Sequence, residues 1–190
     1  MSSGCPDASA FRVNLAARVL HNGGIVAYPT EAVWGLGCDP ESDRGLRALL
    51  EIKRRDIGKG LILVAADISQ FSSLLAPLSL QQRRILQNTW PGPVTWLIPH
   101  RGRVHPLVHG GQTQVALRVS DHPLVQKLCT AFGGPLVSSS ANPQSRPPAM
   151  DSSAVRRYFA GGVDYLLPGA LGGLERPTEI RDLESGCVIR

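Results

Sequence analysis

The chain has 190 residues, of which 43% are hydrophobic, so it is long enough to bury one substantial core. Its mean hydropathy of −0.02 is ordinary for a globular protein, and no segment approaches the roughly 18 apolar residues of a membrane span. Residues 1–9 have neither the basic start nor the apolar core of a signal peptide. We therefore expect a cytoplasmic protein with no membrane partner.

The charge of the chain favours anionic partners. The formal net charge is +5 and the isoelectric point is about 9.4, which attracts nucleotides, RNA or DNA without specifying a fold. The four cysteines, at positions 5, 38, 129 and 187, form no C-x-x-C pair and predict reduced thiols. For His100, His105 and His109, which share one Gly/Arg-rich stretch, a metal site and a solvated loop are both open, and the composition favours the loop.

The first element is a predicted helix that Gly23-Gly24 ends. Asp7 or Ser9 would cap it, and Phe11, Leu15 and Val19 would share one apolar face because they recur at helical spacing.

A short strand is expected next, over residues 25–28, and a glycine-punctuated turn region over residues 29–39. Ser42 would cap a second helix, whose apolar side leads into Lys53. Gly35 and Gly37 lack the third glycine of a dinucleotide fingerprint and no helix opens there, so a Rossmann site is excluded. A G-x-x-x-x-G-K-[ST] motif, the signature of a P-loop, is also missing from the sequence.

Helices and strands continue to alternate to the end of the chain. Further strands are expected over residues 60–66, 94–98, 115–119, 136–137 and 163–167. Further helices are expected to begin at Asp67, Ser79, Pro123 and Asp151, and the tail 179–189 reads as a hairpin. The prediction is a single α/β domain over residues 7–190, with a twisted mixed sheet flanked by helices. The loops 99–113 and 168–177 read as flaps over a site.

The most informative segment is Ser138-Ser139-Ser140-Ala141-Asn142, which follows an apolar run at a point where a buried strand is expected to break into a loop. Its hydroxyls and amide are well placed there to hold a polar ligand. An Asx-type turn that satisfies its own backbone is an equally good interpretation of the segment alone.

A cationic cluster, Lys53-Arg54-Arg55 with Lys59 just beyond, lies at the end of the second predicted helix. Fixed cations of this kind suit a polyphosphate or a carboxylate. A solvated helix end that complements the helix dipole is the alternative.

Two further polar residues lie at predicted strand ends. Thr30 presents a hydroxyl directly after the strand 25–28, either to a ligand or within an ordinary β-turn. Arg118 ends an apolar strand, where an arginine is expensive to desolvate unless it pairs. Its partner is either Asp121 or the carboxylate of a ligand.

Five motifs and a closing segment resemble the YrdC family in order and spacing, over nearly the whole chain, and in particular its short bacterial form without the extra C-terminal domain. They are YPTEAVWGLG at 28–37, KRR at 53–55, WPGPVT at 90–95, LRVSDHP at 117–123, SSSAN at 138–142 and the closing PTEIRD at 177–182.

The resemblance implies a YrdC-like fold and threonylcarbamoyl-AMP synthase activity. The substrates would be L-threonine, bicarbonate or CO2, and ATP. Mg²⁺ would accompany ATP, and no side chain of the protein is assigned as a ligand of this metal. The products would be threonylcarbamoyl-adenylate and pyrophosphate. Downstream tRNA threonylcarbamoyl-transfer proteins would then modify an adenosine beside the anticodon, and tRNA or other RNA would meet the basic surface.

The resemblance also implies roles for particular residues. The family's Lys-x-Arg and Ser-x-Asn pairs correspond here to Lys53/Arg55 and Ser140/Asn142. Lys53 and Arg55 would be the catalytic cations on ATP, because negative charge builds on the phosphates as pyrophosphate leaves. Lys59 would be a further phosphate ligand, and Ser140 and Asn142 would position phosphate or ribose.

Four residues would hold the threonine by the same resemblance: Thr30, Arg118, Ser138 and Thr178, with Arg118 on the carboxylate. Two positions depart from the family pattern. Lys59-Gly60-Leu61 stands where longer relatives often have Asn-Pro-Leu, and Gln114 replaces a serine before the Arg118 strand.

A second hypothesis is a basic RNA-binding module without catalytic activity. The positive charge supports both hypotheses, but only 5% of the residues are aromatic and no basic run alternates with aromatic residues. Platforms for stacking bases are therefore scarce. Threonine-dependent release of pyrophosphate separates the two hypotheses.

Overall fold

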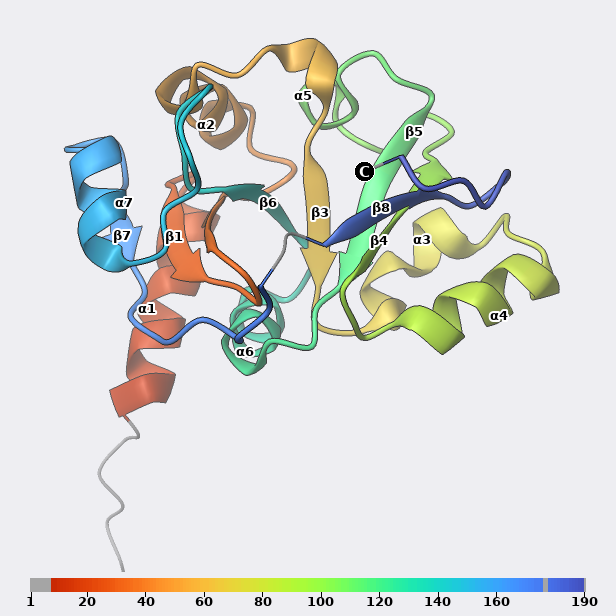
Figure 1. Ribbon diagram of the computed structural model, residues 1–190, viewed down its shortest axis with the longest axis horizontal. Helices are drawn as coiled ribbons and strands as arrows, with labels where there is room; N and C mark the ends of the chain where they lie inside the picture. The colour runs from red at the N-terminus through yellow and green to blue at the C-terminus, as the bar shows by residue number, and fades with distance from the viewer. Residues whose placement is uncertain (1–7, 176–177, 190) are drawn as a thin grey trace, which may run out of the picture.

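The computed structural model describes residues 8–175 and 178–189, and one eight-stranded mixed sheet forms its centre (Figure 1). The strands are β1 (Val26–Pro29), β2 (Trp34–Gly37), β3 (Ile62–Ala65), β4 (Val94–Pro99), β5 (Gln114–Val119), β6 (Leu136–Ser140), β7 (Tyr165–Leu166) and β8 (Glu179–Asp182). Their order in the sheet is β7-β1-β2-β6-β3-β5-β4-β8. The pairs β1/β7, β3/β5 and β4/β8 are parallel and the other neighbours are antiparallel, so the predicted mixed α/β sheet is confirmed.

Helices lie on both sides of this sheet. They are α1 (Ala8–His21), α2 (Asp43–Lys53), α3 (Ser72–Leu75), α4 (Leu80–Thr89), α5 (Pro106–His109), α6 (Pro123–Phe132) and α7 (Ser152–Tyr158), with the 3₁₀ turns η1 (Ile57–Lys59) and η2 (Ile68–Phe71). Within the described ranges, none of these helices has the length and apolar character needed to cross a membrane.

The helix ends follow the local signals in the sequence. Ser42 Oγ accepts a hydrogen bond from the Gly45 N–H at 3.1 Å, and Ser79 forms a capping box with Gln82. Asp151 caps α7, and Gly133 ends α6 in the left-handed conformation with a φ of 85°. Of the two caps predicted for α1, Asp7 lies outside the described residues, and Ser9 is wrong because it lies inside the helix, which begins at Ala8.

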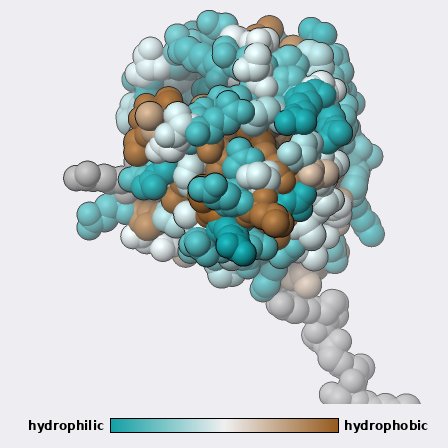
Figure 2. Space-filling model, turned by 90° about the vertical axis from the view of Figure 1, so that its right-hand side faces the viewer, coloured by the Kyte–Doolittle hydropathy of each residue, from teal (hydrophilic) through white to brown (hydrophobic). Residues whose placement is uncertain are grey.

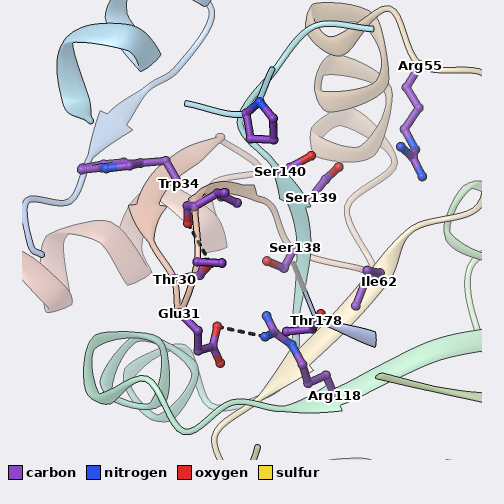
Figure 3. A pocket seen from close by; sticks show the side chains of 14 residues that line it. Thr30, Glu31, Trp34, Arg55, Ile62, Arg118, Ser138, Ser139, Ser140 and Thr178 are labelled. Carbon is purple, nitrogen blue, oxygen red and sulfur yellow. Dashed lines mark hydrogen bonds and ion pairs between the residues drawn. The ribbon is translucent and has the colours of Figure 1, made fainter. Parts of the chain in front are cut away.

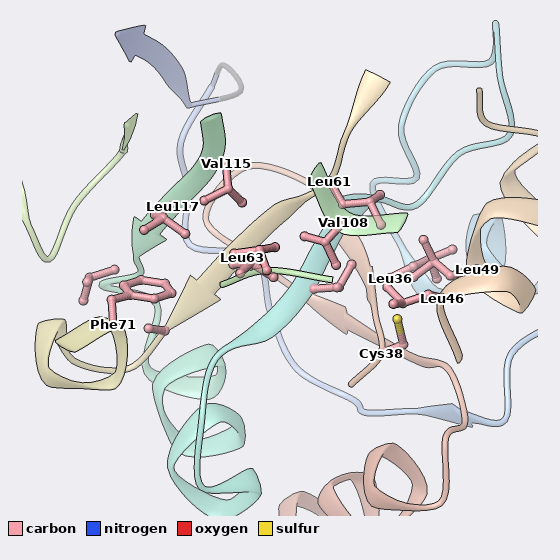
Figure 4. Packing of buried hydrophobic residues seen from close by; sticks show 14 of the residues in the cluster. Leu36, Cys38, Leu46, Leu49, Leu61, Leu63, Phe71, Val108, Val115 and Leu117 are labelled. Carbon is pink, nitrogen blue, oxygen red and sulfur yellow. The ribbon is translucent and has the colours of Figure 1, made fainter. Parts of the chain in front are cut away.

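Two hydrophobic clusters lie on opposite faces of the sheet. One joins α1 and α6 to the strands through residues such as Leu20, Tyr28 and Leu128. The other, drawn in Figure 4, joins Leu36 and Leu63 of the strands to Leu46 and Leu49 of α2. The sheet is therefore covered on both faces, and polar side chains in its middle strands can be desolvated.

The apolar face predicted for α1 is only partly buried, since of its three residues only Val19 packs against the core. Phe11 is 65% exposed and Leu15 is 37% exposed, whereas Val13, Ala16 and Leu20 are buried. The small alanine lets α1 approach its neighbours closely, and a pattern based on large apolar side chains gives alanine too little weight.

The predicted turn region 29–39 contains β2, and β6 extends through Ser140 instead of ending at Val137. Gly37 is a sheet residue and not a turn glycine. A Cβ atom at this position would lie 2.7 Å from the Val137 oxygen and 2.8 Å from Tyr28 Cε1. Glycine is needed here because the backbone passes close to its neighbours.

The remaining predicted elements lie close to their expected positions. The tail forms the predicted hairpin, with an antiparallel bridge between Arg181 and Val188. The loop 99–113 contains the short helix α5.

Candidate active site

A cavity of about 180 Å³ is lined by polar residues from the turn after β1, from β5 and from β6 (Figure 3). Thr30, Arg118, Ser138 and Thr178 all line it. They come from the turn after β1, from β5, from β6 and from the segment leading into β8. The structure thus brings together the four residues predicted to hold threonine, and we call this space the amino-acid cavity.

Arg118 pairs with Glu31, which the sequence analysis did not assign to the site. Arg118 Nη1 lies 2.9 Å from Glu31 Oε2, and the two residues are only 6% and 3% exposed. Asp121, one of the two predicted partners, is exposed and makes no ion pair with Arg118. That interpretation is wrong because Asp121 follows the strand end, whereas Glu31 reaches the arginine from a neighbouring turn.

The environment of Glu31 keeps its carboxylate ionised. Burial alone would raise the pKa of Glu31, but the Arg118 charge and the hydrogen bond from Ser120 outweigh burial, so the pKa lies below its ordinary value. Ser120 Oγ donates to Glu31 Oε1 at 2.6 Å and accepts from the His122 N–H at 3.2 Å. The carboxylate is therefore held on one side by Ser120 and on the other by Arg118.

Hydroxyl groups supply the rest of the polar lining. Thr30 Oγ1 donates to the Val33 oxygen at 2.8 Å, so its lone pairs are left to accept from a ligand. Thr178 Oγ1 lies 3.4 Å from the buried Thr95 Oγ1, which fixes it beside the cavity. Gly35 leaves the space open, because a Cβ there would lie 3.1 Å from Thr30 Cγ2.

A second, smaller cavity of about 70 Å³ adjoins the first. Its lining residues are Lys53, Arg55, Lys59, Ser140, Asn142 and Gln144. All five residues predicted to bind ATP therefore meet in one place, and we call it the phosphate cavity. Arg55 and Ser140 line both cavities.

Lys53 is 3% exposed, so the interpretation of a solvated helix end is wrong for this residue, although Arg54 and Lys59 are exposed. Its ammonium donates to the main-chain oxygens of Ser140 and Asn142, the second at 2.8 Å. Burial, followed by the nearby charge of Arg55, lowers the pKa of Lys53 to about 7.

The end of β6 forms a polar turn as well as a wall of the phosphate cavity. Ser140 Oγ donates to Asn142 Oδ1 at 2.6 Å, and Asn142 Nδ2 donates to the Arg146 oxygen at 2.7 Å. The two interpretations of this segment are therefore compatible, because the self-satisfied turn lines the cavity. Rigid polar groups of this kind suit a charged ligand.

A third cavity of about 300 Å³ lies beyond Arg55 and Lys59. Its other walls are mainly apolar and include Leu61, Ile62, Leu97, Val108, Ala116 and Ile180. Gln114 also lines it and donates to Asp182 Oδ2 at 2.8 Å.

Figure 2 shows the side of the molecule that carries α4 and β8, with hydrophobic surface between hydrophilic residues. Arg55 lines all three cavities, and its Nη2 donates to the Gly60 oxygen at 3.0 Å.

This set of motifs and cavities matches a known family. The family model Sua5/YciO/YrdC, described as telomere recombination, matches residues 18–190. The chain belongs to the Sua5/YciO/YrdC family.

Relatives within the Sua5/YciO/YrdC family are close in sequence. The threonylcarbamoyl-AMP synthase of Chromohalobacter salexigens is 55% identical over 182 residues, which cover 96% of this chain and 98% of that protein. The synthase of Hahella chejuensis is 52% identical over 96% of this chain and 99% of its own.

Solved structures of the family share the fold. P. abyssi Sua5 complexed with L-threonine matches with a TM-score of 0.86 and 26% identity, over 92% of this chain and 52% of that one. E. coli YciO matches with a TM-score of 0.84 and 25% identity, over 98% of this chain and 90% of that one.

The histidine stretch of this Sua5/YciO/YrdC chain is a folded loop. His100 and His109 stack with ring centroids 4.2 Å apart, and His100 Nε2 lies 2.9 Å from the Gln112 oxygen. Over residues 8–175 and 178–189, no three His, Cys, Asp or Glu side chains are grouped so that they could hold a metal ion. The predicted solvated loop is wrong for His100, which is only 8% exposed, and His109 ends the short helix α5.

Proposed function

We propose that this chain is a threonylcarbamoyl-AMP synthase that makes threonylcarbamoyl-adenylate and pyrophosphate from L-threonine, bicarbonate or CO2, and ATP. One observation carries the proposal. Arg55 and Ser140 line both the amino-acid cavity and the phosphate cavity, so ligands in the two cavities would meet there. Relatives with this activity in their names match nearly the full chain, and a Sua5 structure holds L-threonine.

The reaction needs an amine, a carbon source and a phosphate in one place. The threonine nitrogen attacks CO2, an N–C bond forms, and the nitrogen loses a proton. A carbamate oxygen then attacks the α-phosphorus of ATP. The bond from that phosphorus to the oxygen that bridges to the β-phosphate breaks, and pyrophosphate leaves with its electron pair.

The cations around the phosphate cavity would stabilise this displacement. Arg55 and Lys59 flank the path between the phosphate cavity and the third cavity, and Lys53, with a pKa of about 7, adds a buried charge when it is protonated. Preorganised charges of this kind act where negative charge develops in the transition state. The mainly apolar third cavity would hold the base of the nucleotide, since a purine is large and flat.

Arg118 would bind the threonine carboxylate, with Thr30, Ser138 and Thr178 around the rest of the molecule. ATP would enter as its Mg²⁺ complex, so the metal comes with the substrate. The product would pass, in the cytoplasm, to proteins that transfer the threonylcarbamoyl group to an adenosine beside the tRNA anticodon. Exposed cations near the cavities, Arg54 and Lys59 among them, would meet tRNA or other RNA.

Pyrophosphate release tests the proposal. We expect release only when L-threonine, bicarbonate and MgATP are all present, and the adenylate should appear in equal amount. Omission of threonine or bicarbonate is the control. Equal release in their absence, or no release together with tight RNA binding, would favour the RNA-binding module over the enzyme.

A further inference from the structure

We propose that Glu31 is a positioning residue for substrate recognition. Its carboxylate holds the Arg118 guanidinium in the one orientation that can bind the carboxylate of the amino-acid substrate. The inference rests on the proposed function, because it takes threonine as the ligand of Arg118.

Glu31 is among the residues that line the amino-acid cavity, but its carboxylate contacts are with other protein side chains. Oε1 accepts from Ser120 Oγ at 2.6 Å, and Oε2 lies 2.9 Å from Arg118 Nη1. The Glu31 side chain is only 4% exposed, so little of its carboxylate is offered to a ligand. Glu31 therefore acts on the substrate through Arg118.

Arg118 keeps donors that the protein does not use. A guanidinium has five N–H groups. Arg118 Nε is buried without a hydrogen-bond partner among the described residues, although Arg118 lines the amino-acid cavity. Glu31 Oε2 also meets Arg118 as an ion pair without a hydrogen-bond partner among the described residues. Buried polar atoms are rarely left unpaired, so an arginine kept only for the scaffold would have its Nε satisfied within the protein.

Hydrogen bonds of the main chain also hold Glu31 in place. The segment 168–174 crosses beside it: the Leu174 N–H donates to the Glu31 oxygen at 2.9 Å, and the Gly172 N–H donates to the Thr30 oxygen at 3.0 Å. A Cβ at Gly172 would lie 2.9 Å from Glu31 Cα. The backbone of Glu31 is therefore held by the segment 168–174 and its carboxylate by Ser120, so the carboxylate that pairs with Arg118 has a fixed position.

Two effects of removing the Glu31 charge oppose each other. Loss of the negative charge strengthens the attraction of Arg118 for a carboxylate. Loss of the anchor leaves a buried guanidinium uncompensated, so that it is free to turn toward solvent and lose the geometry needed for two parallel hydrogen bonds. We expect the second effect to win, because paired recognition of a carboxylate depends on direction more than on net charge.

Equilibrium binding of threonine by calorimetry, in the absence of ATP, tests the inference. Glu31→Gln keeps the shape of the side chain and should weaken threonine binding about tenfold, the lower end of what supporting carboxylates contribute at metal sites. ATP binding should be unchanged. Asp121→Asn is the matched control, since Asp121 is an exposed carboxylate three residues after Arg118 without an ion pair to it, and its threonine affinity should equal that of the wild type.

A double-mutant cycle separates positioning from a general structural role. In an Arg118→Lys background, Glu31→Gln should cause little further loss of threonine affinity, because the group that it orients is already gone. Losses that add in full would overturn the inference, and so would threonine binding to Glu31→Gln that is unchanged or tighter.

Ser120→Ala provides a second variant if Glu31→Gln does not fold. It keeps both charges and removes only the hydrogen bond to Glu31 Oε1. We expect a smaller loss of threonine affinity in the same direction, and wild-type affinity would count against the inference. If the wild type itself binds no threonine, the proposed function fails together with the inference. Normal wild-type binding with an unaffected Glu31→Gln overturns the inference alone.

Discussion

Lys53 and Asn142 are joined beside the phosphate cavity, with Lys53 Nζ 2.8 Å from the main-chain oxygen of Asn142. The Gln144 N–H completes the connection by donating to the Lys53 oxygen at 3.0 Å. Because Lys53 ends α2 and Asn142 follows β6, one residue ties a helix to the polar turn that lines the cavity. Lys53 therefore shapes this cavity as well as placing a charge beside it.

We expect Lys53→Ala to lower both stability and turnover. The substitution leaves the part-buried Asn142 oxygen without the Lys53 donor, whereas the Ser140 oxygen still accepts from the Asn142 N–H at 2.9 Å. We expect this loss to cost about 1–3 kcal/mol in the free energy of unfolding. The substitution also removes a cation beside the phosphates, and loss of a comparable electrostatic group lowers turnover about 10²-fold or more. Urea denaturation and steady-state kinetics measure the two effects. A variant with wild-type stability would show that the turn at Ser140 holds itself in place.

The pH dependence of stability follows from the lowered pKa of Lys53. Its folded-state pKa is about 7 against an ordinary value of 10.5. Between these values the unfolded chain binds the extra proton, so stability rises with pH over this window, and the penalty of the buried charge is fully present below pH 7. Urea denaturation of the wild type and of Lys53→Met from pH 6 upward isolates this residue. We expect the wild type to gain stability relative to the variant as the pH rises, and a constant difference would contradict the assignment.

Arg55→Ala should lower turnover with little effect on folding. Arg55 is only partly buried and lines all three cavities, so its charge serves the ligands more than the core. We expect a loss in kcat of about 10²-fold or more. Arg54→Ala, at the exposed neighbouring position, is the matched control and should keep wild-type kinetics. Similar losses in the two variants would mean that net charge, and not position, is what matters.

Arg118→Lys should raise the KM for threonine far more than the KM for ATP. Lysine keeps the positive charge for Glu31 but cannot make two parallel hydrogen bonds to a carboxylate. The rise in melting temperature on adding threonine should also shrink, because weaker binding stabilises the native state less. A stability loss with both KM values unchanged would limit Arg118 to its ion pair.

L-Serine should be a poorer substrate than L-threonine. The amino-acid cavity has apolar walls, including Ala32, Val33 and Ile62, against which the threonine methyl group can pack. Loss of one such group is worth on the order of 1 kcal/mol in kcat/KM. Competition between the two amino acids at limiting concentration measures this preference, and equal rates would remove the claim.

Helix boundaries were predictable because a few adjacent residues encode each of them. Ser42, Ser79 and Asp151 cap helices as expected, and Gly133 ends one. These signals act within a single turn of the chain and need no tertiary context.

The missed strand β2 shows where local signals fail. Gly35 and Gly37 predict a turn, but both lie inside the sheet, where close approach of Tyr28 and the β6 backbone excludes a side chain at Gly37. Only the packed sheet shows that position 37 must lack a side chain, because a glycine in the sequence is equally typical of a turn and of a crowded strand.

The pairing of Glu31 with Arg118 also could not be predicted from a single sequence. The two residues are far apart in the sequence, since Glu31 lies in the turn between β1 and β2 and Arg118 lies in β5, and β6 and β3 separate β2 from β5 in the sheet. The available signal was a carboxylate beside the apolar run Ala32-Val33, because a buried acid needs a cation. The resemblance to known motifs did place the other cavity residues together, as motifs report shared geometry that local patterns do not.

Arg55 belongs to three cavities, yet its guanidinium occupies one position at a time. Because Arg55 Nε and Nη2 already donate to the Gly60 oxygen, ligands in the neighbouring cavities share one ordered cation. The affinities are then coupled, and the coupling is reciprocal: threonine changes the affinity for ATP by the same factor as ATP changes the affinity for threonine.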